Sequence, residues 1–378
     1  MRKRKIALAL QWSFMAHREN ILGALDYAAK AEHWDLYRID GDPILHYTQL
    51  AGIKCDGILT NIHDERYLSA LDDMSCPIVR VDNIVEAGGI PGVFPDDAAV
   101  GRFAAQYFLE RRFSDFAVLT YPGEVFGQER IAAFMEEVKP HPCHVIELSD
   151  LRDASRYKYA LKKFKEKDEP TAVFAVDDDL AIHLIYEARC LGIAIPDSLS
   201  VLGVGNNEFV CRKSVIPLSS IVLPERECGY DAARMLDELL DGKSVADRTL
   251  LPLKIVTRQS SDYFAVGDKV IARALRIIHS EFETPVSVGT LAKDISVNRR
   301  TLERRFRRVM KVSPLEEVMR VRMSRAQRML LHSDKRIIEV AYEATFPDLK
   351  SMEIQFEKRL GMSPKVYREQ AGAGLDYE

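Results

Sequence analysis

The sequence predicts an α/β domain with two lobes, built from parallel sheets with helices on both faces, followed by an all-α domain with two helix-turn-helix motifs. Short β-branched runs alternate with amphipathic helical stretches through the first two thirds of the chain. Near residue 265 this alternation ends, and helical periodicity continues alone. An internal repeat then occupies most of the last hundred residues.

Bulk properties restrict the class of protein. At 378 residues the chain is longer than a single hydrophobic core usually organises, so we expect several domains. No run approaches the roughly 20 apolar residues of a membrane helix, which argues against a membrane protein. The apolar run 6–10 after the basic residues 2–5 is too short for a secretion signal, so we predict a first strand there. Six cysteines without a CxxC pair indicate reduced thiols in the cytoplasm.

Charge divides the chain more sharply than its net value of −4 suggests. From Asp268 to the end the formal charge is +6, whereas residues 1–267 carry −10. A basic surface favours contact with nucleic acid and an acidic one opposes it. The second part is therefore the one expected to hold DNA.

The first domain is expected to span residues 1–264. Strands and helices alternate, which is typical of parallel sheets covered by helices. The predicted strands are 6–10, 35–39, 57–59, 78–81, 116–119, 145–148, 172–176 and 199–204, and the predicted helices are 18–31, 98–111, 128–137, 154–164, 180–191 and 225–240. The series breaks near residues 85–97, which predicts two lobes with a cleft. Ligands of such sheets bind beyond the carboxyl ends of the strands.

Four ordered motifs in this domain resemble the effector domain of LacI/GalR repressors. They are AVFAVDD (172–178), LGIAIPDSLSVLG (191–203), PLSSI (217–221) and PLKIVTRQSS (252–261). The resemblance implies a periplasmic-binding-protein fold and a sugar ligand. The helix-turn-helix headpiece of those repressors does not precede the first strand here, so we expect another segment to bind DNA.

The motif positions also imply a set of cleft residues. Carboxylates and guanidinium groups bind pairs of sugar hydroxyls with fixed geometry. By resemblance the set contains Asp96, Arg130, Asp177, Asp178 and Asn206 of the Gly205-Asn206 turn. The repressors usually carry aspartate at the position of Gly205, which leaves the identity of the sugar open. Trp12 and Tyr121 each follow a predicted strand, and Trp12 could stack on the C–H face of a sugar ring.

Other interpretations of these residues remain open. Arg130 could pair with Glu129 or Glu137 on its own helix, Asp96 and Asp178 could cap helices, and Trp12 could be a core or hinge aromatic. Asp177-Asp178-Asp179 could form a metal or phosphoryl-transfer cluster, but no glycine-rich phosphate loop accompanies it. No catalytic constellation stands out, so we predict neither an enzyme nor a cofactor.

The second domain is expected to span residues 265–370, with a tail at 371–378. Its repeat consists of Leu291-Ala292 followed by Leu302 and Phe306, then Val340-Ala341 followed by Met352 and Phe356 at one residue greater spacing. After the turn Ser296-Val297-Asn298 comes a helix with six arginines in ten residues, whose core side is predicted to hold Leu302, Phe306 and Val309. Such a helix suits a phosphate-lined groove, although a solvated charged face is the simpler alternative.

Ser313-Pro314 predicts a capped helix start between the two copies, and residues 315–332 then continue the helical pattern. That helix would be about 27 Å long, against roughly 34 Å between successive major-groove faces of B-DNA. The pattern resembles the DNA-binding domain of the AraC/XylS family, through residues 337–341, Phe346, 356–364 and 367–368. Thr345 and Ile354 depart from it, standing where the family favours glycine and arginine.

The resemblance and the exposed helix face give the expected DNA-contacting residues. They are Arg299, Arg300, Thr301, Glu303, Arg304 and Arg307 in the first motif, and Leu349, Lys350, Ser351 and Glu353 in the second.

Taken over nearly its whole length, the chain resembles XylR-type, xylose-responsive activators of the AraC/XylS family. The resemblance implies an activator of pentose utilisation with D-xylose as first candidate, and as partners operator DNA, a second copy of the chain and RNA polymerase, with no membrane. Two alternatives stay open: a carbohydrate-modifying enzyme with a helical appendage, and a ligand-independent DNA-binding protein whose first domain dimerises.

Overall fold

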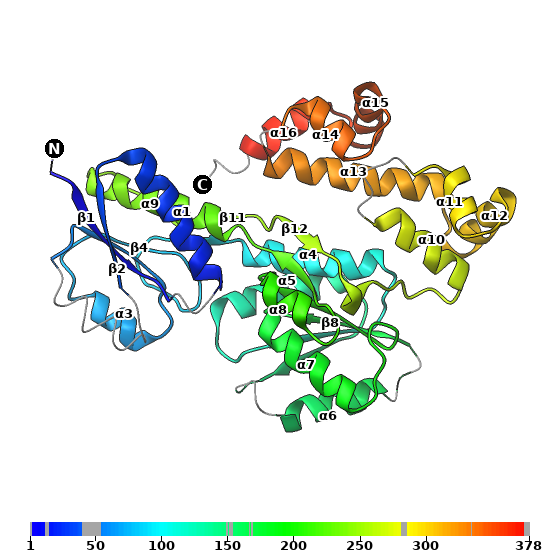
Figure 1. Ribbon diagram of the computed structural model, residues 1–378, viewed down its shortest axis with the longest axis horizontal. Helices are drawn as coiled ribbons and strands as arrows, with labels where there is room; N and C mark the ends of the chain where they lie inside the picture. Colours follow the sequence, from blue (N-terminus) through cyan, green and yellow to red (C-terminus); the bar gives the residue numbers. More distant parts are fainter. Residues whose placement is uncertain are drawn as a thin grey trace. The chain divides into compact units, whose positions relative to one another are not determined.

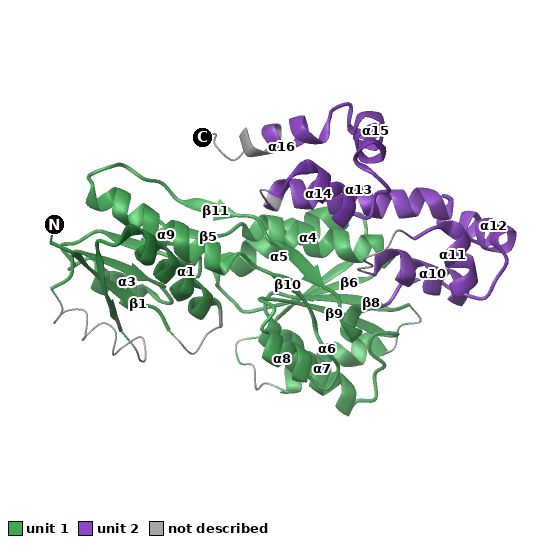
Figure 2. Cartoon of the chain, turned by 45° about the horizontal axis from the view of Figure 1, so that its top comes forward, with its two compact units in different colours: residues 1–262 green, residues 263–378 purple. Residues whose placement is uncertain are grey.

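The computed structural model describes residues 2–11, 15–39, 54–148, 150, 154–165, 167, 169–280, 286–333 and 335–373. The chain divides into two compact units, Met1–Asp262 and Tyr263–Glu378 (Figure 2). This division lies close to the boundary expected after residue 264. Within the described ranges, no helix has the length and apolar character needed to cross a bilayer.

The first lobe of unit 1 is a four-stranded parallel sheet in the order β2-β1-β3-β4 (Figure 1). Its strands are β1 (Arg4–Ala9), β2 (Trp34–Arg38), β3 (Gly57–Thr60) and β4 (Ile78–Arg80). Successive β1 side chains point to opposite faces: Ile6 and Leu8 pack in one apolar cluster, and Ala7 and Ala9 in another. Helices α1 (Met15–Ala31) and α9 (Glu225–Leu240) contribute to the first cluster, and α3 (Glu65–Leu71) to the second.

Helices α1 and α9 cross with their backbones in close contact, which requires glycine at the crossing. A Cβ atom at Gly23 would lie 1.9 Å from the carbonyl oxygen of Arg226, and one at Gly229 would lie 2.0 Å from that of Asn20. Larger residues would force the helices apart. Since α9 comes more than 190 residues after α1, this contact ties a late segment of the chain into the first lobe.

The second lobe is a six-stranded sheet in the order β12-β10-β9-β8-β6-β7. The strands are β6 (Phe116–Thr120), β7 (Cys143–Glu147), β8 (Thr171–Ala175), β9 (Leu199–Val204), β10 (Ser219–Val222) and β12 (Lys254–Val256). The expectation of a purely parallel sheet is wrong at β12, which pairs antiparallel with β10. This edge strand follows an excursion of the chain through the first lobe, so no crossover helix of the second lobe fixes its direction.

Helices cover both faces of the six-stranded sheet, as predicted (Figure 1). Figure 1 shows α4 (Asp97–Glu110) and α5 (Val125–Val138) on one face, with α6 (Ala154–Lys165) and α7 (Asp178–Cys190) on the other. The short α8 (Glu208–Lys213) follows β9. Loops after β6, β8 and β9 therefore open at the same edge of the sheet.

The chain passes between the lobes at three places. After β4 it runs through β5 (Val93–Pro95) into α4, and after β10 it enters α9. It returns through β11 (Arg248–Leu250), which pairs with β5 in a parallel two-stranded sheet, and continues to β12. The predicted break near residues 85–97 is thus confirmed as the first crossing.

Unit 2 is all-α, as predicted, and consists of two small cores joined by one helix. Its helices are α10 (Lys269–His279), α11 (Val288–Asp294), α12 (Arg299–Met310), α13 (Pro314–His332), α14 (Ile337–Glu343), α15 (Leu349–Leu360) and α16 (Pro364–Ala373). The first half of α13 packs with α10 to α12, and its second half packs with α14 and α15. Ser313 forms a capping box with proline at the first helical position, which confirms that prediction. Helix α16 includes residues 371–373, which were expected in the tail.

The turn of each helix-turn-helix places one residue in the left-handed region: Ser296 has φ +59° and Thr345 has φ +64°. Glycine adopts this conformation without steric cost, which explains why the AraC/XylS family favours glycine where this chain has Thr345. The one-residue difference between the repeats follows from the longer connection before α15, since Asn298 caps α12 two residues after Ser296, and Asp348 caps α15 three residues after Thr345.

The variant Ser296→Gly is expected to stabilise unit 2 by about 0.5 to 1 kcal/mol, because it relieves the strain of a Cβ atom at positive φ. Ser296 is exposed, so the change removes no buried contact. Thermal unfolding followed by circular dichroism would measure the effect. Ser296→Ala keeps the Cβ atom and serves as the control, and a lower melting temperature for the glycine variant than for the alanine variant would contradict this account of the turn.

Candidate effector site and nucleic-acid interface

Arg130 lies buried at the carboxyl edge of the second lobe. Its Nε and Nη2 atoms both lie 2.7 Å from Oδ1 of Asp97, and its Nη1 donates to the carbonyl oxygen of Val176 at 2.5 Å. Only 6% of Arg130 and 2% of Asp97 is exposed, so this ion pair is shielded from water. The alternative partners on its own helix, Glu129 and Glu137, do not make these contacts. Arg130 therefore joins the end of β8 to the start of α4.

The two aspartates that begin α4 have different environments. Burial raises the pKa of the Asp97 carboxyl, although the neighbouring Arg130 guanidinium acts in the opposite direction. Asp96 accepts a hydrogen bond from the backbone N–H of Ala99 at 2.7 Å and so caps α4. Asp96 thus has the capping role considered from the sequence, while its carboxylate stays partly exposed, 4.0 Å from Arg102.

Tyr121 and Asp177 are brought together from the ends of β6 and β8. The Tyr121 hydroxyl lies near the Asp177 side chain, whose charge, after burial, helps to raise the Tyr121 pKa, and Asp177 accepts from the backbone N–H of Leu180 at 2.8 Å and caps α7. Burial is the main cause that raises the pKa of Asp177. Arg130 donates to the carbonyl oxygen of Val176, the residue directly before Asp177. Tyr121, Asp177 and Arg130 therefore belong to one cluster.

Asp178 is buried and holds the turn after β9. Its carboxylate accepts hydrogen bonds from Ser220 Oγ at 2.6 Å, the backbone N–H of Asn207 at 3.0 Å and Cys211 Sγ at 3.3 Å. Burial raises its pKa to about 7. The capping role that the sequence left open for Asp178 belongs to Asp177 instead.

Asn206 lies in the left-handed region, with φ +50°, directly after Gly205 at φ +113°. Its side-chain oxygen accepts a hydrogen bond from Arg258 Nη2 at 2.8 Å. A Cβ atom at Gly205 would lie 3.6 Å from Oδ2 of Asp178, so the Asp178 carboxylate stands close to the position where the repressors carry an aspartate. Sequence reasoning missed Arg258, because nothing in the strand pattern shows that it reaches back to this turn.

Two buried carboxyl groups at the same edge were also missed. Glu225 begins α9, Glu124 directly precedes α5 without a side-chain capping hydrogen bond, and burial raises the pKa of each to about 7. The pKa of Glu225 also responds to the charges of Arg130, Asp178 and Glu19, so this carboxyl lies near the predicted residues. A glutamate at the first turn after a strand was a usable signal, since loops at this edge line ligand sites.

The exposed face of α12 is strongly basic. Leu302, Phe306 and Met310 are buried in the core, and Val309, which was expected there, is half-buried and packs against the same cluster. The side chains outside the core include the exposed Arg299, Arg300, Arg304 and Arg307 and the half-buried Thr301 and Glu303. Glu303 accepts a hydrogen bond from Arg299 at 2.8 Å, and this pair lies on the surface.

One of the six arginines in this helix has a structural role. Arg305 donates from Nε and Nη2 to the Asp268 carboxylate at 2.9 and 2.7 Å, and that carboxylate also caps α10. These contacts fix α12 against α10 and hold the pKa of Asp268 below its usual value, against the effect of burial. Arg305 was not among the predicted DNA-contacting residues, and its contacts with Asp268 agree with that omission.

Helix α15 is less basic than α12. Lys350 and Glu353 are exposed, Ser351 is half-buried beside the capping residue Asp348, and Leu349 packs partly against the second core. Ile354, where the family favours arginine, is 53% exposed. The second helix thus offers fewer charged groups to a duplex than the first.

Comparison with known proteins agrees with both units. Residues 105–261 match the model of a periplasmic binding protein-like domain, and residues 291–370 match that of a helix-turn-helix domain. The xylose operon regulatory protein of Haemophilus influenzae is 26% identical over 96% of this chain and 98% of its own length. That of Escherichia coli K12 is 24% identical over 97% of each chain.

Solved structures show the same fold. A structure described as the xylose-binding transcription activator xylR aligns with 98% of each chain at a TM-score of 0.63 and 22% identity. A periplasmic binding protein/LacI regulator from Alkaliphilus metalliredigens, complexed with D-xylulofuranose, covers 68% of this chain with a TM-score of 0.56 and 17% identity. The chain is a DNA-binding transcription regulator that joins a periplasmic binding protein-like domain to a helix-turn-helix domain.

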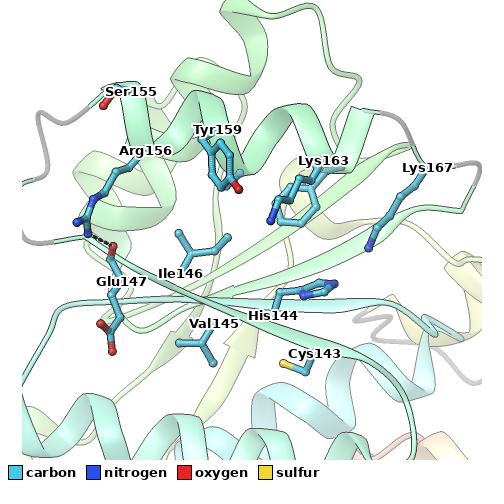
Figure 3. Close-up of a pocket in the computed structure, with 12 residues that line it drawn as sticks. Cys143, His144, Val145, Ile146, Glu147, Ser155, Arg156, Tyr159, Lys163 and Lys167 are labelled. Carbon is cyan, nitrogen blue, oxygen red and sulfur yellow. Dashed lines mark hydrogen bonds between the residues drawn. The ribbon is translucent and has the colours of Figure 1, made fainter.

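A separate cavity of about 630 Å³ lies between β7 and α6 of this regulator (Figure 3). None of the predicted effector residues lines it. Two of its cations already have partners, since Lys167 binds Asp115 at 2.6 Å and Arg156 donates to the carbonyl oxygen of Glu147 at 2.8 Å. The predicted effector residues that the structure describes lie at the carboxyl edge of the sheet and not in this cavity.

Two predictions lack a structural outcome. Trp12 lies outside the described residues. Among the residues that the structure describes, no three histidine, cysteine, aspartate or glutamate side chains are grouped to hold a metal ion, so the triple-aspartate alternative has no support from geometry.

Proposed function

We propose that this regulator is a cytoplasmic activator that binds an uncharged pentose, with D-xylose as first candidate, at the carboxyl edge of unit 1. The observation that carries the proposal is the convergence of Arg130, Asp177, Asp178 and Asn206 from separate strands and helices of one sheet edge. Asp96, Tyr121 and Trp12 complete the proposed site. The names of the full-length relatives point to xylose.

The chemistry of this edge favours a neutral ligand. Buried carboxyl groups outnumber the arginines, and burial raises the pKa of Glu124, Asp178 and Glu225 to about 7. An anionic sugar would add negative charge to a region that already disfavours it. Hydroxyl groups, by contrast, donate to carboxylates and accept from guanidinium groups.

A thermal-shift panel tests this preference. D-xylose at about one hundred times its dissociation constant should stabilise the folded regulator by about 2.7 kcal/mol, because only the folded state binds it. D-xylonate and D-xylose 5-phosphate, at equal concentration, should leave the melting temperature unchanged. A larger shift with either anion than with any neutral pentose would contradict the proposed ligand class.

For DNA, we propose that a homodimer presents α12 and α15 of each chain to adjacent major-groove segments of its operator and contacts RNA polymerase. Helix α13 has 19 residues, or about 28 Å at 1.5 Å per residue, which approaches the roughly 34 Å spacing of the groove. The sugar would act by binding one state of the dimer more tightly than the other. The alternative function, a carbohydrate-modifying enzyme, can be tested by a turnover assay on pentoses and hexoses. We expect no product in that assay.

A further inference from the structure

The first lobe holds two cysteine thiols in contact with each other. Cys55 comes two residues before β3 and Cys76 two residues before β4, and these strands are parallel neighbours in the first sheet. Their Sγ atoms lie 3.8 Å apart in hydrogen-bond contact, and both thiols are free. A disulfide bond holds its sulfur atoms about 2.05 Å apart, so the two side chains are already close to the bonded arrangement.

The backbone next to both thiols is held in place. The N–H of Asp56 donates to the carbonyl oxygen of Lys5 at 2.7 Å, and the N–H of Ile58 donates to that of Pro77 at 3.0 Å. The first bond anchors the chain just after one cysteine, and the second anchors it just after the other. The sheet itself therefore keeps the two thiols adjacent.

The pair is also accessible from outside the molecule. Cys55 and Cys76 pack against the apolar cluster of the first lobe on one side, yet both are only half-buried. Cys211 and Cys228, by contrast, are buried. A small molecule can thus reach the first two thiols without unfolding of the lobe.

The contact between the two thiols makes Cys55 the more reactive one. Cys76, as its hydrogen-bond partner, lowers the pKa of Cys55 to about 7, against the effect of burial. The same contact raises the pKa of Cys76. Burial raises the pKa of Cys143, another half-buried thiol, to about 11. Because the thiolate is the nucleophile, Cys55 is expected to attack a small-molecule disulfide first.

We propose that Cys55 and Cys76 form a reversible redox site of unit 1, at which a small-molecule disulfide such as glutathione disulfide converts the two thiols into an intramolecular disulfide. First, the Cys55 thiolate bonds to one sulfur of glutathione disulfide, whose own S–S bond breaks and releases a glutathione thiolate. The Cys76 thiolate then attacks the Cys55 sulfur and releases the second glutathione. Two protein thiols are oxidised, one glutathione disulfide is reduced, and the two protons pass through solvent to the glutathione thiolates.

The contact that hinders the second thiol disappears during the reaction. The Cys55 sulfur is the main cause that raises the pKa of Cys76, and it carries no charge once it is in the mixed disulfide. Cys76 can then lose its proton more readily and complete the bond.

The disulfide would close the loop 55–76, which contains β3 and α3. Closing a loop removes conformations from the unfolded chain, so we expect oxidation to raise the melting temperature by about 5 °C or more. The pair lies at the amino ends of β3 and β4, whereas the proposed effector residues lie at the carboxyl ends of strands. Oxidation therefore consumes none of the proposed effector side chains.

The test uses the full, folded, reduced chain in glutathione buffers of decreasing ratio of thiol to disulfide. Remaining thiols are blocked with N-ethylmaleimide, and trypsin then separates the two cysteines because it cleaves after Arg66. Mass spectrometry should find peptides 55–66 and 67–80 joined by a disulfide, and dithiothreitol should release them and return the melting temperature to its reduced value.

Three variants separate the steps. Cys76→Ser should stop at the mixed disulfide between Cys55 and glutathione, because the second thiol is gone. In Cys55→Ser, Cys76 should react with glutathione disulfide at least about tenfold more slowly than Cys55 does in Cys76→Ser. Cys190→Ser removes an exposed thiol elsewhere and is the matched control, which should form the link like the wild type.

Because the main readout is made on the wild type, it does not depend on the folding of any variant. Absence of the linked peptides even in glutathione disulfide alone, or a reaction that stops at a mixed disulfide on Cys55, would overturn the proposal. So would a link that forms only after the chain is unfolded in urea, because the folded structure would then not bring the thiols together. A lower melting temperature of the linked chain would also decide against it.

Discussion

Replacing Arg130 with methionine is expected to lower the free energy of unfolding of unit 1 by about 3 to 5 kcal/mol. The change leaves the Asp97 carboxylate, only 2% exposed, buried without its cation, and breaking one side of a buried ion pair has this order of cost. It also removes the hydrogen bond to the Val176 carbonyl oxygen. Urea unfolding followed by tryptophan fluorescence reports on unit 1 directly, since Trp12 and Trp34 are the two tryptophans of the chain.

A double variant distinguishes the effect of the unpaired Asp97 carboxylate from other effects of the Arg130 mutation. Arg130→Met with Asp97→Asn removes both charges, so we expect it to recover about half of the lost stability while still failing to bind the sugar. Arg102→Met, on the exposed side of α4, is the matched control and should change stability by less than about 0.5 kcal/mol. A loss below about 1 kcal/mol for Arg130→Met alone would show that the buried pair does not hold this edge together.

Removing Arg304 should weaken operator binding by about 1 to 3 kcal/mol, or roughly 5- to 150-fold. Arg304 lies near the middle of the exposed face of α12, opposite the core residues Leu302 and Phe306. If Arg304 reads a base, the loss falls on one operator position and preference there relaxes. Competition binding against operators with single substitutions, selected first from random duplexes, would measure this.

The control for Arg304→Ala must remove the same charge elsewhere. Arg212→Ala in α8 does so on an exposed side chain that pairs with Glu208, and we expect operator affinity close to that of the wild type. A uniform loss across all operator sequences, with a smaller salt dependence, would reassign Arg304 to a phosphate contact. An unchanged affinity would contradict the role of this helix face.

Sequence periodicity was sufficient to predict most of the fold, because each strand and helix buries its own apolar side. Alternation along β1 and the 3.6-residue period of α12 are local properties, and the break near residues 85–97 marked the first crossing between lobes. The antiparallel direction of β12 was not predictable in this way. It depends on the path of the chain through the other lobe, which no local pattern records.

The residues of the site could be predicted from their type and motif position, but most of their contacts could not. Arg130 and Asp177 were named from motif positions, but their partners Asp97 and Tyr121 come from helices and strands distant in sequence. Arg305 illustrates the converse, since its exposed neighbours gave no sign that it is held by two hydrogen bonds to Asp268.

The central claim is that a sugar bound in unit 1 changes how unit 2 holds DNA. The most direct measurement is the dissociation constant of the full chain for its selected operator, with and without saturating D-xylose, at fixed salt. We predict a difference of about 5- to 150-fold, corresponding to a coupling free energy of about 1 to 3 kcal/mol. Equal operator affinity in the presence and absence of a sugar that calorimetry shows to be bound would contradict the account.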